Sequence, residues 1–210
     1  FAPGERHVGG QFDRYSLGSE RAMWMLGITH SFPGFWGGNY DYTRLDLTMN
    51  DRWRMGLAGR MEWQANAGAY LGSAPFPLLE VVPASGTLLL SSNGFNLLNF
   101  YELITDQWVR GGAEWHAEGL IFNHLPILRR LGWREVASVQ GVYGTWDDRH
   151  EVLLELPEST SGLNGVYWEV SAGVENIFQF LRIDAVRRMD GAENPALGIW
   201  GWRMGFSAEF

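Results

Sequence analysis

The stretch "RMEWQANAGAYL", residues 60–71, alternates strictly between two kinds of side chain. One set is small or apolar and comprises Met61, Trp63, Ala65, Ala67, Ala69 and Leu71. The other set is largely polar and comprises Arg60, Glu62, Gln64, Asn66, Gly68 and Tyr70. A period of two predicts a β-strand with one apolar face and one polar face. A tilted strand needs about 9 to 11 residues to cross a bilayer, so this stretch is long enough to do so.

The same alternation recurs along the 210-residue chain and predicts eight strands in all. Residues 44–55 alternate in the same way, and a short turn at residues 56–59 joins them to the opening stretch as a hairpin. The other six expected strands cover residues 22–32, 107–118, 133–146, 166–175, 181–188 and 199–210. Residues 1–19 are expected to hold either an additional strand or a poorly ordered segment. We therefore expect one all-β domain over residues 1–210.

The composition favours lipid over water as the environment of the apolar face. The mean hydropathy is only -0.16, yet the chain holds 11 Trp, 12 Phe, 7 Tyr and 27 Gly. No run approaches the roughly 18 apolar residues of a membrane helix, whereas half-apolar strands with aromatic girdles are typical of outer-membrane barrels. A soluble β-sandwich or soluble barrel also alternates, but its small core would have to accommodate many bulky Trp side chains. We expect an antiparallel transmembrane β-barrel of about eight strands, or the last strands of a larger barrel.

Charge and cysteine content narrow the function classes. The formal net charge of -8 argues against a nucleic-acid partner, whose binding surface would be basic. The absence of cysteine excludes disulfides, zinc–thiolate sites and thiol nucleophiles, and it suits an oxidising compartment. Because the chain begins at Phe1 and not at Met, we expect either a removed signal peptide or a fragment.

The connections between the expected strands alternate in length. The long connections, residues 75–104 and 147–165, fall on the same side of the sheet. Outer-membrane barrels have long extracellular loops and short periplasmic turns, so we expect an outer-membrane protein with a periplasmic C-terminus. Residues 120–132 form a longer link on the periplasmic side, where their apolar residues, with Arg129 and Arg130, could lie along the inner interface.

Several unusual segments resemble a known family. In order they are "YDYTRLDL" (40–47), "PFPLLEVVP" (75–83), "FNLLNFYELITDQW" (95–108), "GLIFNHLPILRRLGWREV" (119–136), "GVYG" (141–144), "GVENIFQFLRIDAVRR" (173–188) and "GFSAEF" (205–210). From about Tyr40 onward, roughly four-fifths of the chain resembles the C-terminal barrel region of Bacteroidota outer-membrane proteins that carry a carboxypeptidase-like regulatory domain and a large domain of unknown function. The resemblance implies an outer-membrane β-barrel, inserted by the barrel-assembly machinery, with no established activity. The 210 residues do not include the regulatory domain and are far fewer than in members of the family, so we expect either the final part of a larger barrel or a reduced stand-alone version.

The polar faces of the strands predict a network of charges in the lumen. An eight-stranded barrel is just wide enough for side chains to fill it, and buried charges must be paired. The expected network comprises Arg44, Asp46, Arg60, Glu62, Arg110, Glu114, His116, Glu118, Glu169, Arg182, Asp184 and Arg203. Arginine suits this role because it pairs with carboxylates in a bidentate manner. We expect a lumen filled by ion pairs; the alternative is a selective path or a ligand site.

Two further features carry functional hypotheses. Residues 75–100 are long, apolar and punctuated by proline, and we expect them to act as a plug or as a docking surface for other outer-membrane proteins. This segment begins with Pro75, Phe76, Pro77, Leu78 and Leu79. Phe210 resembles the terminal aromatic residue by which assembly machinery recognises a last strand.

The sequence offers little for catalysis, and we expect no catalytic, cofactor or metal site. His116 and Glu118 are two residues apart and could help bind a metal, but a hydrogen-bonded pair in the lumen is the preferred interpretation. The five histidines are scattered, without a nucleophile elbow or a paired-acid motif. We expect a structural or complex-forming membrane component, with a passive or gated transport barrel as the alternative and a membrane-rim hydrolase as the second alternative.

Overall fold

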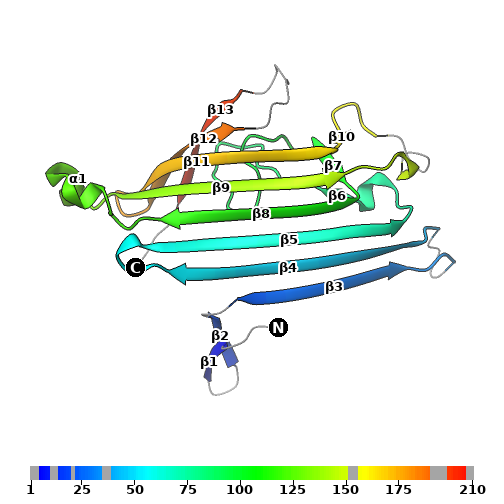
Figure 1. The fold of residues 1–210 in the computed structure, drawn as a ribbon, viewed down its shortest axis with the longest axis horizontal. Coiled ribbons are helices and arrows are strands. Elements are labelled where there is room, and N and C mark those ends of the chain that lie inside the picture. Colours follow the sequence, from blue (N-terminus) through cyan, green and yellow to red (C-terminus); the bar gives the residue numbers. More distant parts are fainter. Residues whose placement is uncertain are drawn as a thin grey trace.

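The alternating segments of the sequence form eight strands of one antiparallel sheet (Figure 1). The computed structural model describes residues 5–9, 14–19, 22–34, 39–150, 156–189 and 198–206. The strands are Met23–Ser31 (β3), Tyr42–Arg54 (β4), Arg60–Gly72 (β5), Gln107–His116 (β8), Arg134–Thr145 (β9), Gly165–Ile177 (β11), Leu181–Arg188 (β12) and Trp200–Phe206 (β13). Their order in the sheet is β13-β12-β11-β9-β8-β5-β4-β3, so each is paired with its neighbours along the chain. The prediction of an all-β fold with eight strands is confirmed.

The connections alternate in length as the sequence predicts. At one end, which we call the turn end, β4 and β5 are joined by a 3-10 turn (η2, Gly56–Ala58), and β11 and β12 by residues 178–180. The third connection at this end, between β8 and β9, carries a 3-10 turn (η4, Phe122–His124) and a short helix (α1, Pro126–Leu131). Connections 73–106 and 146–164 lie at the opposite end, the loop end (Figure 1). None of the helices in the described ranges is long and apolar enough to cross a membrane.

The long connections contain structure of their own. Within them, Glu80–Val81 (β6), Leu103–Thr105 (β7) and Ser161–Gly162 (β10) form a small sheet in the order β10-β7-β6. Two 3-10 turns, η3 (Phe76–Leu78) and η5 (Asp148–His150), lie in the same connections. Residues 75–100, which the sequence predicts to act as a plug or a docking surface, therefore belong to a structured connection. Near the N-terminus, Glu5–Gly9 (β1) and Arg14–Ser19 (β2) pair as a separate two-stranded hairpin.

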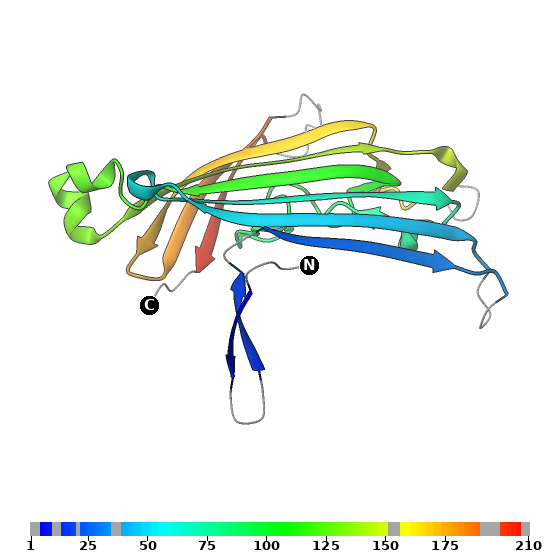
Figure 2. The ribbon, with the colours of Figure 1, turned by 60° about the horizontal axis from the view of Figure 1, so that its bottom comes forward.

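The two faces of the large sheet differ in kind. The register of β4 with β5 runs without a bulge from Tyr42 opposite Gly72 to Arg54 opposite Arg60. Because side chains alternate across a strand, this register aligns the apolar sets on one face and the charged sets on the other. We call the face that bears the charges the inner face, since connection 73–106 lies against it (Figure 2), and the opposite one the outer face.

The sheet has two edges among the described residues. Strands β3 and β13 stand at the two ends of the strand order, and the described ranges contain no pairing between them. Residues 88–90 lie along the outer edge of β13 as an isolated parallel bridge. Met204 N donates to Leu88 O at 2.9 Å, and Leu90 N donates to Met204 O at 2.7 Å. The connection thus covers part of one edge as well as the inner face.

Candidate functional site

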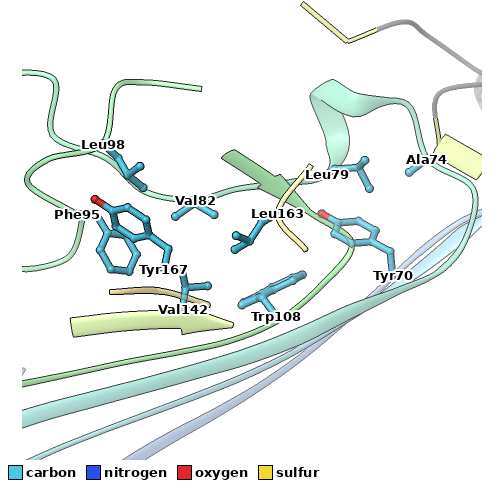
Figure 3. Packing of buried hydrophobic residues seen from close by; sticks show 10 residues of the cluster. All are labelled: Tyr70, Ala74, Leu79, Val82, Phe95, Leu98, Trp108, Val142, Leu163 and Tyr167. Carbon is cyan, nitrogen blue, oxygen red and sulfur yellow. The ribbon is translucent and has the colours of Figure 1, made fainter. Parts of the chain in front are cut away.

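An apolar cluster fills the loop-end half of the inner face (Figure 3). The sheet contributes Tyr70, Trp108, Val142 and Tyr167, and the connections contribute Ala74, Leu79, Val82, Phe95, Leu98 and Leu163. Hydrogen bonds satisfy the polar tips of two of these aromatics. Trp108 Nε1 donates to Asn66 Oδ1 at 2.5 Å, and the Tyr70 hydroxyl donates to the Leu78 carbonyl at 2.6 Å. Connection 73–106 is therefore held on the sheet by a hydrophobic core.

This cluster was not predicted from the sequence. We expected the inner face to be filled by charges, but near the loop end several of its buried side chains are aromatic or aliphatic. A signal was present, because Tyr70, Trp108 and Tyr167 fall in sets whose other members are polar or small. An aromatic residue in the polar set of a strand indicates that something apolar covers it.

Glu80 joins the connection to the sheet through two predicted lumen arginines. Arg44 Nη2 lies 3.0 Å from one Glu80 oxygen, and Arg110 Nη1 lies 3.3 Å from the other. Arg44 also donates to Asp46 at 2.7 Å and 2.8 Å. The structure thus brings together Arg44, Asp46 and Arg110, and places between the two arginines a carboxylate that the sequence analysis did not assign.

Glu169 holds the backbone of the same connection at a second point. Its carboxylate is 1% exposed and accepts the N–H groups of Asn96 and Leu97, each at 2.8 Å. The hydroxyl of Tyr167 donates to it at 2.5 Å. Arg203 donates to the Asn96 carbonyl from the other side. Two predicted lumen residues, Glu169 and Arg203, therefore bind the peptide backbone. For Glu169, the sequence predicts an arginine partner instead.

The turn-end half of the inner face carries a network of paired charges. Arg182 binds Glu114 with both terminal nitrogens at 2.8 Å and 2.9 Å, and its Nε donates to the buried Asp184 at 2.7 Å. His116 lies between two carboxylates, with Nε2 2.9 Å from Glu114 and Nδ1 2.9 Å from Glu175. The network links β8, β11 and β12, so it ties together strands up to three pairings apart in the sheet.

The remaining predicted charges meet near the hairpin at the turn end. Arg60 lies 3.5 Å from Glu62 and 3.2 Å from Glu118. His116 and Glu118 therefore have different partners: His116 binds Glu114 and Glu175, and Glu118 binds Arg60. The pairs of Arg60 with Glu62 and Glu118 are partly exposed, so each contributes little to stability.

The predicted plug residues lie at the loop end. Pro75 and Leu79 are buried, Phe76 packs against the apolar cluster, and Pro77 and Leu78 are exposed. Phe210, the expected assembly signal, lies outside the described residues.

A polar cavity of about 560 Å³ remains between the connection and the sheet. Its polar lining includes Asn50, Glu62, Gln64, Ser91, Asn93 and Gln140. The described residues contain no group of three or more His, Asp or Glu that could hold a metal ion. The cavity can therefore take a polar guest through hydrogen bonds to amides, hydroxyls and carboxylates.

The described histidines bind to different kinds of partner. His116 binds carboxylates, and the buried His150 lies 3.2 Å from the Ala74 carbonyl and 3.6 Å from Asp106. His30 Nδ1 lies 2.8 Å from the hydroxyl of Thr43, on the exposed surface. In the described part of the chain, no histidine has both a hydroxyl nucleophile and an orienting carboxylate as partners, the arrangement that activates a nucleophile in hydrolases.

Comparison with known proteins gives one match. A family model described as "Family of unknown function (DUF5686) C-terminal domain" matches residues 1–150. The match includes the residues before Tyr40, where the resemblance noted in the sequence begins, and it ends before β10 to β13. Among curated proteins and among solved structures, none matches the chain significantly.

Proposed function

The chain belongs to the DUF5686 family of unknown function, whose C-terminal domain it carries, and we propose that it is a non-enzymatic integral outer-membrane β-barrel protein with a filled lumen. Its role is structural or complex-forming. Its surroundings are the outer-membrane bilayer of a Gram-negative bacterium, in keeping with the resemblance to Bacteroidota proteins, and the barrel-assembly machinery inserts it.

The observation that carries this proposal is the inverted polarity of the sheet. On the outer face, Val109, Trp202 and Phe206 are 58%, 69% and 69% exposed, and many other large apolar side chains are exposed with them. On the inner face, the charged Glu169 and Asp184 are buried. A soluble sandwich buries its apolar face and exposes its charges, whereas a membrane barrel with a polar interior does the reverse.

The ends of the strands support an orientation. Trp53, Trp63 and Trp115 lie near the turn-end termini of β4, β5 and β8, and Trp53 and Trp63 contact each other with ring centroids 5.9 Å apart. Tryptophan is enriched where a barrel meets the membrane–water interface. Together with the two short connections at the turn end, this aromatic group supports a periplasmic turn end and an extracellular loop end.

Closure of the sheet is part of the proposal. An open sheet edge is not tolerated in lipid, because its N–H and C=O groups have no partner there. In the bilayer, β3 and β13 therefore pair with each other, or with further strands of a larger barrel. If another strand pairs with the free edge of β13, the hydrogen bonds between Met204 and residues 88–90 break, and Met204 bonds to the new strand instead.

The connection that fills the inner face supports a structural role over transport. Residues 75–100 are held on the inner face of the sheet by the apolar cluster, by the ion pairs of Glu80 and by the hydrogen bonds from their backbone to Glu169. The same connection exposes Leu88, Leu89, Phe100 and Tyr101. These exposed side chains give other outer-membrane proteins an apolar surface to dock on.

Two alternatives have an observation in their favour. The cavity of about 560 Å³ favours a passive or gated transport barrel, and conductance across a planar bilayer distinguishes it, since a filled barrel conducts no ions. The contact between His30 and Thr43 favours a hydrolase at the membrane rim. A comparison of lipid A with and without the protein tests that second alternative.

The substitution Val139→Arg tests membrane insertion directly. Val139 lies midway along β9, on the outer face opposite Ala113 and Val170. An arginine at the centre of a lipid-facing strand costs about 2–4 kcal/mol, whereas an exposed substitution on a soluble protein changes stability by about 0.5 kcal/mol or less. We expect a large loss of folded, heat-modifiable protein on refolding into vesicles, with Ser159→Arg in an exposed loop as the control. Equal insertion of the two variants would contradict the proposal.

A further inference from the structure

Residues 117–133, which we call the turn-end knob, are rigidly attached to the sheet. The carboxylate of Glu135 accepts the N–H groups of Gly119 at 3.1 Å and Ile121 at 2.8 Å, and also that of Phe122. Asn176, near the turn-end terminus of β11, donates to the carbonyl of Gly132 at 2.7 Å. Because the backbone is held at both ends, the side chains of the knob have a defined direction.

The knob exposes apolar side chains. Ile127 is 75% exposed, and Ile121, Leu125 and Leu131 are also exposed. Figures 1 and 2 both show α1 lying beyond the ends of β5 and β8 and away from connection 73–106. A rigid apolar surface that does not pack on its own domain indicates a binding surface.

The neighbouring turns carry the same kind of side chain. Leu57 in the β4–β5 turn is 96% exposed, and Phe178 in the β11–β12 turn is exposed as well. All three connections at the turn end therefore present apolar groups. Leu57 and the knob follow Trp53 and Trp115, which stand near the turn-end termini of β4 and β8.

The charge of the knob identifies its partner. The knob has one acidic residue, Glu118, which pairs with Arg60, and its residues 119–133 contain no Asp or Glu in a chain whose net charge is -8. The two basic side chains, Arg129 and Arg130, are exposed in the last turn of α1. Apolar side chains beside basic ones suit the interface of a bilayer, where the chains enter the acyl boundary and the charges meet lipid phosphates.

We propose that the turn-end knob seats on the inner leaflet of the membrane and binds the headgroups of anionic phospholipids. This inference rests on the proposed function, because it needs the sheet to be in a bilayer. It goes beyond that function by assigning a lipid-binding surface to a connection that stands outside the sheet. The apolar residues anchor the knob, and Arg129 and Arg130 make the anchoring depend on anionic lipid.

Single-cysteine variants test the inference cleanly, because the chain has no cysteine of its own. An environment-sensitive fluorophore is attached to Ile127→Cys in the knob, to Val109→Cys on the outer face, and to Ser159→Cys in a loop. Each full-length protein is inserted into phosphatidylcholine vesicles with or without phosphatidylglycerol. Quenching by lipids that carry a shallow spin label is then compared with quenching by aqueous iodide.

We expect the label at position 127 to be quenched by the shallow spin label, and more strongly when phosphatidylglycerol is present. The pair Arg129→Gln and Arg130→Gln removes this dependence. The ratio of seated to free knob falls about fivefold per arginine, since a basic side chain near an anionic surface contributes about 1 kcal/mol and about 1.36 kcal/mol is a factor of ten. Arg54→Gln is the matched control, because Arg54 is exposed at the same end but on the inner face of β4.

The outcomes separate the two proposals. If the label at position 109 is not quenched by lipid, the proposed membrane function fails. If position 109 is quenched while position 127 is as open to iodide as position 159, only the knob inference fails. Shielding of position 127 from iodide without quenching by lipid also overturns it, since the knob then binds a protein or a second copy of the chain.

Discussion

At the scale of single residues, Glu169 shows how the protein secures a long connection without a disulfide. Its buried carboxylate receives two backbone N–H groups and one hydroxyl. Hydrogen bonds to a charged acceptor are about twice as strong as neutral ones, and a buried carboxylate without partners is costly. The anchor is therefore selective, because only a backbone that supplies both N–H groups satisfies it.

Replacing Glu169 with Gln is expected to loosen the connection. An amide oxygen accepts less strongly, and the NH2 group faces an N–H donor, so at least one hydrogen bond to Asn96 or Leu97 is lost. We expect the free energy of unfolding in detergent to fall by about 1.5–3 kcal/mol. Amide hydrogen exchange of residues 91–97 should speed up. Glu158→Gln, in an exposed loop, is the control, and equal exchange in both variants would argue against the anchor.

Gly68 is required by the close approach of a buried indole. A Cβ at this position would lie 2.3 Å from Trp108 Cζ2 and 2.7 Å from the Leu45 carbonyl oxygen. We expect Gly68→Ala to destabilise the protein by about 1–3 kcal/mol, as overpacking does. At Gly112, by contrast, the nearest atom would be Gln140 Cβ at 3.5 Å, so Gly112→Ala is expected to be neutral or slightly stabilising. Urea midpoints of the two variants test this difference.

At the scale of elements, β12 illustrates what alternation does in this sheet. Arg182, Asp184, Val186 and Arg188 are buried on the inner face, whereas Arg187 is exposed on the outer face beside Trp200. Within one strand, an arginine side chain is thus buried or exposed according to the face of the sheet on which its position falls. The buried set joins β12 to β8 through the pair between Arg182 and Glu114.

The substitution Arg182→Gln should be far more harmful than Arg187→Gln. Removal of Arg182 leaves the buried Asp184 without its ion-pair partner and Glu114 with only His116. Breaking a buried ion pair from one side costs about 3–5 kcal/mol. Loss of the cation–π contact between Arg187 and Trp200 costs about 1 kcal/mol or less at an exposed site. Similar urea midpoints for the two variants would mean that the inner network does not stabilise the fold.

At the scale of the whole molecule, the large sheet has two unlike faces, and connection 73–106 lies against one of them (Figure 2). The outer face of the sheet is apolar. Its inner face carries a network of ion pairs at the turn end, and at the loop end an apolar cluster with the ion pairs of Glu80 beside it. The connection covers that cluster and reaches the edge of β13. The inside of the proposed barrel is therefore closed by packing near one end and by paired charges near the other.

Shortening the connection should open the proposed barrel. Replacing residues 84–100 by a short flexible linker removes Phe95 and Leu98 from the cluster and both backbone N–H groups from Glu169. We expect the variant to conduct ions in a planar bilayer, whereas the unaltered protein does not. If the unaltered protein conducts equally well, the connection is not a plug and the transport alternative gains. A folded variant that conducts no ions would mean that the ion pairs alone close the lumen.

The sequence by itself determined the strands and their faces. The period of two is local, because successive side chains of a strand point to opposite sides, so residues 60–71 could be read without their partners. All eight strands, the alternation of turn and loop lengths, and the shared face of Arg44, Glu114 and Arg182 follow from that local rule.

Only the tertiary structure decided what meets on the inner face. Alternation gives a direction but not a partner, since partners such as Glu80 and Arg110, or Glu169 and Asn96, lie far apart along the chain. The small sheet of β6, β7 and β10, the apolar cluster and the bridge from residues 88–90 to Met204 have no local period to reveal them. Their formation depends on how connection 73–106 packs against a curved face, because burial and hydrogen bonding across that interface select one arrangement of a segment with little regular structure.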